Sequence, residues 1–184
     1  MGGPMSVNDD LPWIPMALDL ICKADQQGIP VIGHCLGAQL MAKALGGAVA
    51  KNPVKELGWG EVEAAAAAAQ LATEWLGNTT RFEAFHWHGE TFSIPPGAIR
   101  ILQSAYCANQ AFVRGPHLGL QCHVEMTADM IRSWCQQWAA ENAPPSASVQ
   151  TPQQMDENME ARIAAMRTVA DCLYSRWITG LVSP

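Results

Sequence analysis

A single cysteine stands where a short apolar run changes into a helical pattern, in the segment GIPVIGHCLGAQLMAKALGG at residues 28–47. The run IPVI at residues 29–32 is rich in β-branched residues and is followed by a glycine, which is typical of a buried strand. From Leu36 onward the apolar residues recur at helical spacing until a glycine pair ends the pattern. The sequence therefore predicts that Cys35 lies at a strand-to-helix turn.

Two features of this turn suit a reactive thiol. Gly33 and Gly37 have no Cβ atoms to clash where the neighbours of a nucleophile must approach one another. The N–H groups and the positive dipole end of the following helix favour the thiolate, which is the nucleophilic form. The spacing is that of a nucleophile elbow with cysteine in place of serine. The alternative is that Cys35 is a small buried hydrophobic residue, as most unpaired cysteines are.

A thiol nucleophile needs a base, and the segment LGLQCHVEMT at residues 118–127 offers one. If this segment is extended, His123 and Glu125 project from the same face, because alternate residues of a strand share a face. The carboxylate can then hold one imidazole nitrogen and leave the other free. His86 and His88 also share a face, but no third ligand stands at a recognisable spacing, so we expect no metal.

Together these residues carry a family resemblance. The segment GHCLGAQLMAKALGG (33–47) resembles the nucleophile segment of class I glutamine amidotransferases, and GLQCHVE (119–125) resembles their second signature, usually written Q-F-H-P-E. The segments FHWHGETFSIPPGA (85–98) and GGPMSVNDDLPW (2–13) are similar to a branch of stand-alone proteins that resemble the amidotransferase domain of GMP synthase. The resemblance extends over about residues 2–138, in the right order.

The resemblance implies the fold and the chemistry. The fold of the family is α/β and flavodoxin-like, a doubly wound, mostly parallel sheet with helices on both faces. The family's catalytic triad falls on Cys35, His123 and Glu125. Attack of the thiol on the side-chain amide of glutamine would give a γ-glutamyl thioester and ammonia, and water would then release glutamate. His123 would protonate the leaving ammonia and later activate the water. We expect no cofactor.

The resemblance also assigns the oxyanion and substrate contacts. One donor to the developing oxyanion is the backbone N–H of Leu36, the residue after the nucleophile. Gly3, in a Gly-Gly-Pro loop, is the other, and Gly2 beside it lines the substrate site. In the family, a residue one helical turn after the nucleophile contacts the bound glutamine, and a loop contacts its α-amino and carboxylate groups. These match Gln39 and the loop Trp87, His88 and Gly89.

The sequence departs from the family at its start. In the family an apolar strand comes before the Gly-Gly-Pro loop, and further strands and a helix come before that strand. Here Gly2 directly follows Met1. We therefore expect the first β/α units to be missing, which would uncover apolar faces of the neighbouring strands. Three explanations stay open: a misplaced start site or trimmed chain, a natural truncation that has lost activity, and a homodimer that repairs the sheet. We favour the first.

Composition agrees with a single-domain cytoplasmic enzyme. The chain has 184 residues and 49% apolar content, enough for a sizeable core, and its net charge of −6 argues against a nucleic-acid partner. It has no apolar run of membrane-spanning length and no signal peptide. Its six cysteines form no C-x-x-C pair. We expect a catalytic domain over residues 1–140, a Pro/Ser/Gln-rich linker over 141–154, and an amphipathic helix over 155–180 packing on the same domain.

Glutamine is the leading substrate. Because we identify no synthetase domain in the sequence, the ammonia would pass to a separate accepting protein. Two alternatives remain. In the first, the triad hydrolyses another γ-glutamyl compound or peptide for its own sake. In the second, the chain is a truncated, inactive relative that binds a partner through an open sheet and its terminal helix.

Overall fold

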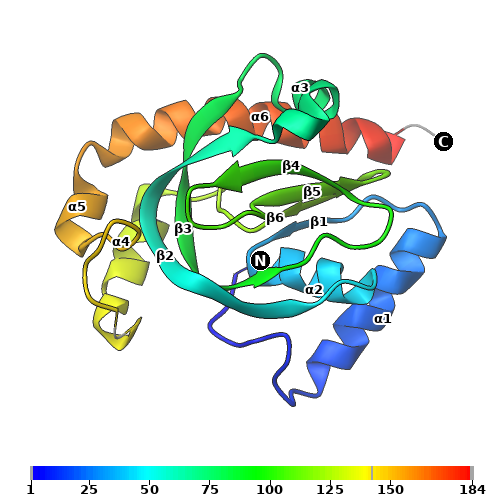
Figure 1. The fold of residues 1–184 in the computed structure, drawn as a ribbon, viewed down its shortest axis with the longest axis horizontal. Helices are drawn as coiled ribbons and strands as arrows, with labels where there is room; N and C mark the ends of the chain where they lie inside the picture. The colour runs from blue at the N-terminus through cyan, green and yellow to red at the C-terminus, as the bar shows by residue number, and fades with distance from the viewer. Residues whose placement is uncertain (1, 142, 183–184) are drawn as a thin grey trace.

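One curved sheet of six strands organises the fold in the computed structural model of the protein, which describes residues 2–141 and 143–182 (Figure 1). The order of the strands across the sheet is β1-β6-β5-β4-β2-β3. The strands are β1 (Ile32–His34), β2 (Val49–Ala64), β3 (Arg81–Phe92), β4 (Ile99–Ser104), β5 (Ala111–Arg114) and β6 (His117–Leu120). The α-helices are α1 (Trp13–Gln26), α2 (Leu36–Ala44), α3 (Ala69–Leu76), α4 (Ala128–Cys135), α5 (Pro152–Asp156) and α6 (Met159–Val182), and the short 3₁₀ helices are η1 (Ala66–Ala68) and η2 (Trp138–Glu141).

The strand pairing is mixed. Strands β1 and β6 are parallel, whereas each of the other neighbouring pairs of described strands is antiparallel. The expected α/β class is therefore present, but the pairing in the described part of the chain differs from the mostly parallel sheet expected. Short connections are the physical reason for the β4–β5 and β5–β6 pairs, whereas the β2–β3 connection contains η1 and α3 and is not short. Only Gly115 and Pro116 join β5 to β6, and a parallel crossover needs a dozen residues or more.

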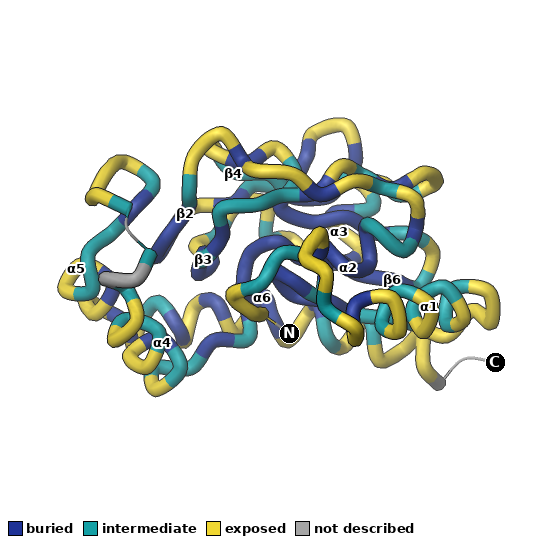
Figure 2. Tube along the Cα trace, turned by 90° about the horizontal axis from the view of Figure 1, so that it is seen from below, coloured by how far each residue is buried: buried dark blue, intermediate teal, exposed yellow. Residues whose placement is uncertain are grey.

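Helices cover both faces of the sheet, as the sequence predicted. Ala111 and Val113 of β5 belong to a core cluster that includes residues of α3 and α6, while Phe112 between them belongs to a second cluster with α1 and α2. Because alternate residues of a strand point to opposite faces, these two clusters lie on opposite sides of the sheet. Figure 2 shows buried residues along the strands and α2, and a largely exposed α1 at the outside.

The longest strands, β2 and β3, form a curled antiparallel pair (Figure 1). Their register shifts between Lys51 and Glu56, and β2 curves around the rest of the sheet. The curl brings the second half of β3 to the turn after β1, so that the carbonyl oxygen of Trp87 lies 3.8 Å from the Cys35 sulfur. This pair therefore builds one wall of the candidate site.

The C-terminal part of the chain packs on the core. One helix was predicted over residues 155–180, but α5 and α6 stand in its place, and Asn158 between them has a φ of 54°. The segment before α5 is hydrogen-bonded to β2. The backbone N–H of Leu57 donates to the carbonyl of Ser148, and the N–H of Gln150 donates to the carbonyl of Leu57. Within the described ranges, neither α6 nor any shorter helix is apolar over a length that would cross a membrane.

Strand β1 forms one edge of the described sheet, because it pairs with β6 alone. A hollow of about 610 Å³ lies beside it. Its lining is mostly apolar and comes from β1, α4 and α6, including Ile32, Met130, Trp134, Tyr174 and Trp177. The described part of the chain thus leaves an uncovered apolar surface next to β1, as expected from the sequence.

The turn between β1 and α2 requires glycine at position 33. A Cβ atom there would lie 2.5 Å from the carbonyl carbon of Gly37, which is main chain and has little freedom to move. We expect Gly33→Ala to lower the free energy of unfolding by about 3 kcal/mol. Gly180→Ala is the control, because the Cβ would approach no closer than 3.4 Å to Pro30 and alanine favours helix. Equal urea midpoints for the two variants would contradict this prediction.

Candidate active site

The backbone of Cys35 is strained at the turn that precedes α2. Its φ of 49° and ψ of −111° are backbone angles that residues other than glycine rarely adopt. The backbone N–H of Cys35 donates to the carbonyl of Leu120 at 2.7 Å, which ties the turn to β6. The predicted strand-to-helix turn is confirmed. It holds the thiol at the N-terminal end of a helix, where the N–H groups favour a thiolate.

His123 and Glu125 are brought together after β6, as their spacing predicted. The Nδ1 atom of His123 lies 2.6 Å from Oε1 of Glu125. Two backbone hydrogen bonds between His123 and Phe85 of β3 hold this segment extended. The Nε2 atom of His123 is buried and faces Cys35, without a hydrogen bond of standard geometry among the described residues. That nitrogen is therefore free to exchange a proton with a reacting group.

The charges around His123 favour its protonated form. Burial alone lowers the pKa of His123, but Cys35 and Glu125 raise it to about 9 through hydrogen bonding and negative charge. Burial likewise raises the pKa of Glu125, but the hydrogen bond and charge of His123 bring it down to about 2. At neutral pH the site therefore contains an imidazolium between a carboxylate and the cysteine sulfur.

Two residues that sequence reasoning missed, His34 and Tyr174, lie next to Glu125. Nε2 of His34 lies 3.6 Å from Oε2 of Glu125 and 3.1 Å from the Tyr174 hydroxyl oxygen. Burial lowers the pKa of His34 to about 4, so its ring is neutral at pH 7. The adjacency of His34 to the nucleophile was a signal for it. Tyr174 lies far along the chain on α6 and gave no signal.

The Gly-Gly-Pro loop lies against both the nucleophile and the base. A Cβ atom on Gly2 would stand 3.2 Å from Cε1 of His123, and one on Gly3 would stand 2.9 Å from Cδ2 of Leu36. These two glycines and Cys35 line one pocket of about 210 Å³. The structure therefore places Gly2, Gly3 and Leu36 around the thiol, and their roles as oxyanion donors or substrate contacts stay predictions.

A second cleft, of about 600 Å³, opens from Cys35 along α2 and β3. Its lining includes all four residues expected to contact the substrate in addition to Gly2: Gln39, Trp87, His88 and Gly89. The side-chain amide of Gln39 donates to the backbone oxygen of Glu90 and to Oε1 of Gln121, each at 3.2 Å. The helix that follows the nucleophile is thereby tied to β3.

Glu141 and Lys55 add charges to the wall of this cleft, and sequence reasoning missed both. Oε1 of Glu141 accepts a hydrogen bond from the indole N–H of Trp87 at 3.0 Å. Its other oxygen accepts one from Nζ of Lys55 at 2.9 Å. Glu141 lies within the segment predicted as a linker, and composition alone gave no reason to place it beside the thiol.

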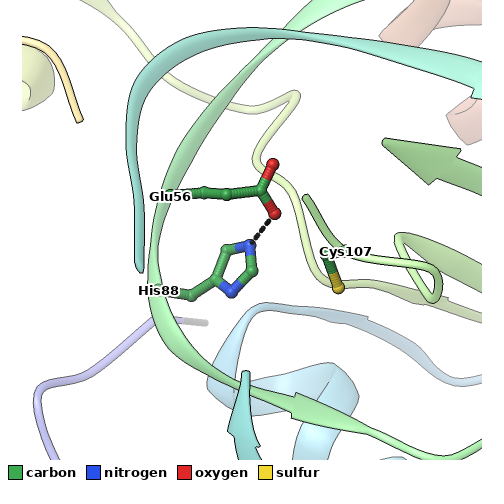
Figure 3. A group of neighbouring side chains, drawn as sticks. All are labelled: Glu56, His88 and Cys107. Carbon is green, nitrogen blue, oxygen red and sulfur yellow. Dashed lines mark ion pairs between the residues drawn. The ribbon is translucent and has the colours of Figure 1, made fainter. Parts of the chain in front are cut away.

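His88 also belongs to a buried cluster of three side chains, together with Glu56 and Cys107 (Figure 3). The ligand atoms of Glu56, His88 and Cys107 lie within 4.8 Å of one another. The sequence showed no third metal ligand near His88 at a recognisable spacing, but the fold brings two possible ligands to it from distant parts of the chain. These side chains could hold a metal ion by type. However, Glu56 Oε2 already accepts from Gln110 at 2.8 Å, and the Cys107 sulfur lies 3.1 Å from the Thr91 hydroxyl. Hydrogen bonds within the protein therefore occupy Glu56 and Cys107, whereas Nε2 of His88 makes none among the described residues.

Comparison with known proteins agrees with this geometry. The family model described as glutamine amidotransferase class-I matches residues 1–133, well over half of the chain. The chain belongs to this family. The resemblance drawn from the motifs is therefore confirmed, and a glutamine amidotransferase domain explains why a cysteine at a strand-to-helix turn lies beside a histidine–glutamate pair.

Individual relatives support the same assignment. GMP synthase [glutamine-hydrolyzing] of Thermomicrobium roseum is 35% identical over 127 residues, which is 68% of this chain and 22% of that protein, so this chain spans less than a quarter of its length. A crystal structure of a glutamine amidotransferase from Methylobacillus flagellatus is 48% identical, with a TM-score of 0.94 over all of this chain and 76% of the other. One from Thermotoga maritima is 28% identical, with a TM-score of 0.82 over 96% and 75%.

Proposed function

We propose that this protein hydrolyses the γ-amide of glutamine to glutamate and ammonia through a γ-glutamyl thioester on Cys35. The family supports amide hydrolysis in general. The observation that carries the specific proposal is the pairing of His123 with Glu125 at 2.6 Å beside a cysteine held at a strained helix N-terminus. This is the arrangement that nucleophilic catalysis requires, a nucleophile, a base and a group that orients the base.

In the first half of the reaction, the sulfur of Cys35 attacks the Cδ carbon of glutamine and a C–S bond forms. The electron pair of the carbonyl moves to oxygen, where the backbone N–H groups of Leu36 and Gly3 are the proposed donors. The C–N bond then breaks while the Nε2 proton of His123 passes to the nitrogen. Ammonia leaves, and a thioester and a neutral imidazole remain.

In the second half, Nε2 of His123 takes a proton from water, and the water oxygen attacks the thioester carbon. The C–S bond breaks, glutamate is released, and the sulfur and imidazolium return to their starting forms. Glu125 acts by holding Nδ1 of His123, so that the free nitrogen faces the reacting atoms in both halves. The substrate contacts proposed for glutamine are Gly2, Gln39, Trp87, His88 and Gly89.

The fate of the ammonia belongs to the same proposal. The matched GMP synthases are named as glutamine-hydrolyzing, and this chain corresponds to less than a quarter of the T. roseum protein. We propose that a separate protein accepts the ammonia, and that the reaction takes place in the cytoplasm, where the free cysteines of this chain would stay reduced.

The direct test is product analysis with the purified chain. We expect L-glutamine to give glutamate and ammonia in equal amounts, and asparagine, which is one methylene shorter, to give little ammonia. γ-Glutamylalanine assayed in parallel tests the alternative that the cleft serves another γ-glutamyl compound. Release of alanine without hydrolysis of glutamine would favour that alternative. If the folded protein releases no product from either substrate, hydrolysis by this chain is contradicted.

A further inference from the structure

Glu56 is a buried carboxylate next to the proposed active site, on the bend of β2 (Figure 3). Only 3% of its surface is exposed, and a buried carboxylate is costly unless it is paired and hydrogen-bonded. Ser104 Oγ donates to Oε1 at 2.8 Å, and Gln110 Nε2 donates to Oε2 at 2.8 Å. Oε2 of Glu56 also lies 3.1 Å from Nε2 of His88.

The contacts of His88 define its protonation. Its Nδ1 atom lies 3.0 Å from the backbone oxygen of Glu90, which can only accept, so Nδ1 must carry a proton. Its Nε2 atom faces the carboxylate oxygen of Glu56, although the N–H direction is off the line to that oxygen. A bare nitrogen lone pair at this distance from a carboxylate would be repelled. A proton on Nε2 would instead face the carboxylate, and a ring protonated on both nitrogens would form a buried ion pair with Glu56.

The neighbouring histidine behaves differently. Nε2 of His86 lies 3.3 Å from the carbonyl oxygen of Gly60, and its Nδ1 lies 3.5 Å from the Gln110 amide nitrogen, which can only donate. One nitrogen donates and the other accepts, so His86 is neutral. Burial lowers its pKa to about 4, in agreement. Nδ1 of His86 lies 4.0 Å from Glu56, so His88 is, among the described residues, the one placed to present a positive charge to this carboxylate at close range.

The ion pair connects to the residues around the thiol. The Glu90 oxygen that accepts from His88 also accepts from the side-chain amide of Gln39 at 3.2 Å. Trp87, one residue before His88, turns its backbone oxygen toward the Cys35 sulfur at 3.8 Å. One path of close polar contacts thus runs from Glu56 through His88 and the Glu90 oxygen to α2.

We propose that Glu56 is a positioning residue, which holds His88 as an imidazolium and thereby fixes residues 87–90 against Cys35 and Gln39. The inference rests on the proposed hydrolysis of glutamine, because residues 87–90 form the wall against which the substrate would lie. Glu56 itself does not line either pocket that contains the thiol, so it acts through His88 rather than by touching the substrate.

The test is Glu56→Gln, which keeps the size of the side chain and removes its charge. We expect KM for glutamine to rise and kcat/KM to fall by about tenfold or more, because small displacements of substrate-positioning groups are costly. Glu63→Gln is the matched control. It is the same substitution on the same strand, at a partly exposed residue that pairs with Arg81 and Gln103, and we expect kcat/KM within about twofold of the wild type.

A second measurement does not depend on activity or on the variant folding. Ring ¹⁵N NMR of the wild type at neutral pH is expected to show two protonated nitrogens on His88, assigned with His88→Gln. In folded Glu56→Gln one of them loses its proton and the Gln39 side-chain amide signal moves. Glu56→Asp, which restores the charge, is expected to recover part of kcat/KM. Thermal unfolding of each variant shows whether it is folded.

Three results would overturn the proposal: a neutral His88 in the wild type, unchanged kinetics in folded Glu56→Gln, or a stoichiometric metal ion that is lost from Cys107→Ala. Metal content by mass spectrometry checks the last. If the wild type does not hydrolyse glutamine, the proposed function fails. The NMR results on His88 and Gln39 then still decide whether Glu56 positions residues 87–90.

Discussion

We expect glutamine hydrolysis to fall by at least about a thousandfold when Cys35 is replaced by alanine. The reason is that no second thiol is among the described residues that line the pocket. Alanine leaves His123 and Glu125 paired but removes the atom that forms the thioester, so only direct attack by water remains. The measurement is the rate of glutamate release from glutamine, with the variant and wild type purified and assayed side by side.

Cys172→Ala is the matched control for this prediction. The thiol of Cys172 is free and exposed on α6, so its loss is expected to leave both activity and stability unchanged. Alkylation with iodoacetamide gives a second readout. The wild type is expected to lose activity on modification at Cys35, and glutamine is expected to protect it. Residual activity in Cys35→Ala close to that of the wild type would exclude Cys35 as the nucleophile.

The part of the site that sequence reasoning predicted is the part encoded by local spacing. The strand, glycine and helical pattern around Cys35 fix a tight turn within about ten residues, so the position of the thiol follows from neighbours in the chain. The alternation of His123 and Glu125 fixes their relation in the same way. Both predictions are confirmed geometrically, because each depended on one element only.

The part that sequence reasoning missed depends on contacts between distant segments. One example is the contact of Glu56 with Cys107 and Gln110. It forms only because β2 curls against β3 and the β4–β5 connection, which contains Cys107 and Gln110, packs against Glu56. Glu56 gave no local signal, because β2 also carries Lys51, Lys55, Glu61 and Glu63. No pattern pointed to Cys107, since nothing in one sequence says which loop will cover a given side chain.

The same limit applies to the C-terminal part of the fold. Proline, serine and glutamine predicted a linker over residues 141–154, but composition does not report the hydrogen bonds that Leu57 exchanges with Ser148 and Gln150. The break before α6 was missed for a related reason. The apolar spacing continues across Asn158, whose φ of 54° interrupts the helix without changing the pattern.

Replacement of Glu125 by glutamine is expected to lower kcat by about a hundredfold or more and to change its pH dependence. The amide can no longer stabilise an imidazolium or fix the tautomer of His123, and the corresponding change in a serine triad costs about ten-thousandfold. In the wild type, His123 keeps its proton up to a pKa of about 9. Without the carboxylate that pKa falls, so the alkaline limb of the pH profile moves to lower pH.

The same carboxylate gives a prediction for stability whose sign is fixed by linkage. The folded pKa of His123, about 9, is above its ordinary value of 6.5, so the stabilisation is complete below pH 6.5 and disappears as the pH rises through 9. Wild-type unfolding free energy should therefore fall by up to about 3 kcal/mol over this interval, and by less in Glu125→Gln. Glu61→Gln, an exposed partner of Arg81, serves as the control. Parallel pH curves for Glu125→Gln and the wild type, in activity and in urea denaturation, would show that Glu125 does not hold the charge of His123.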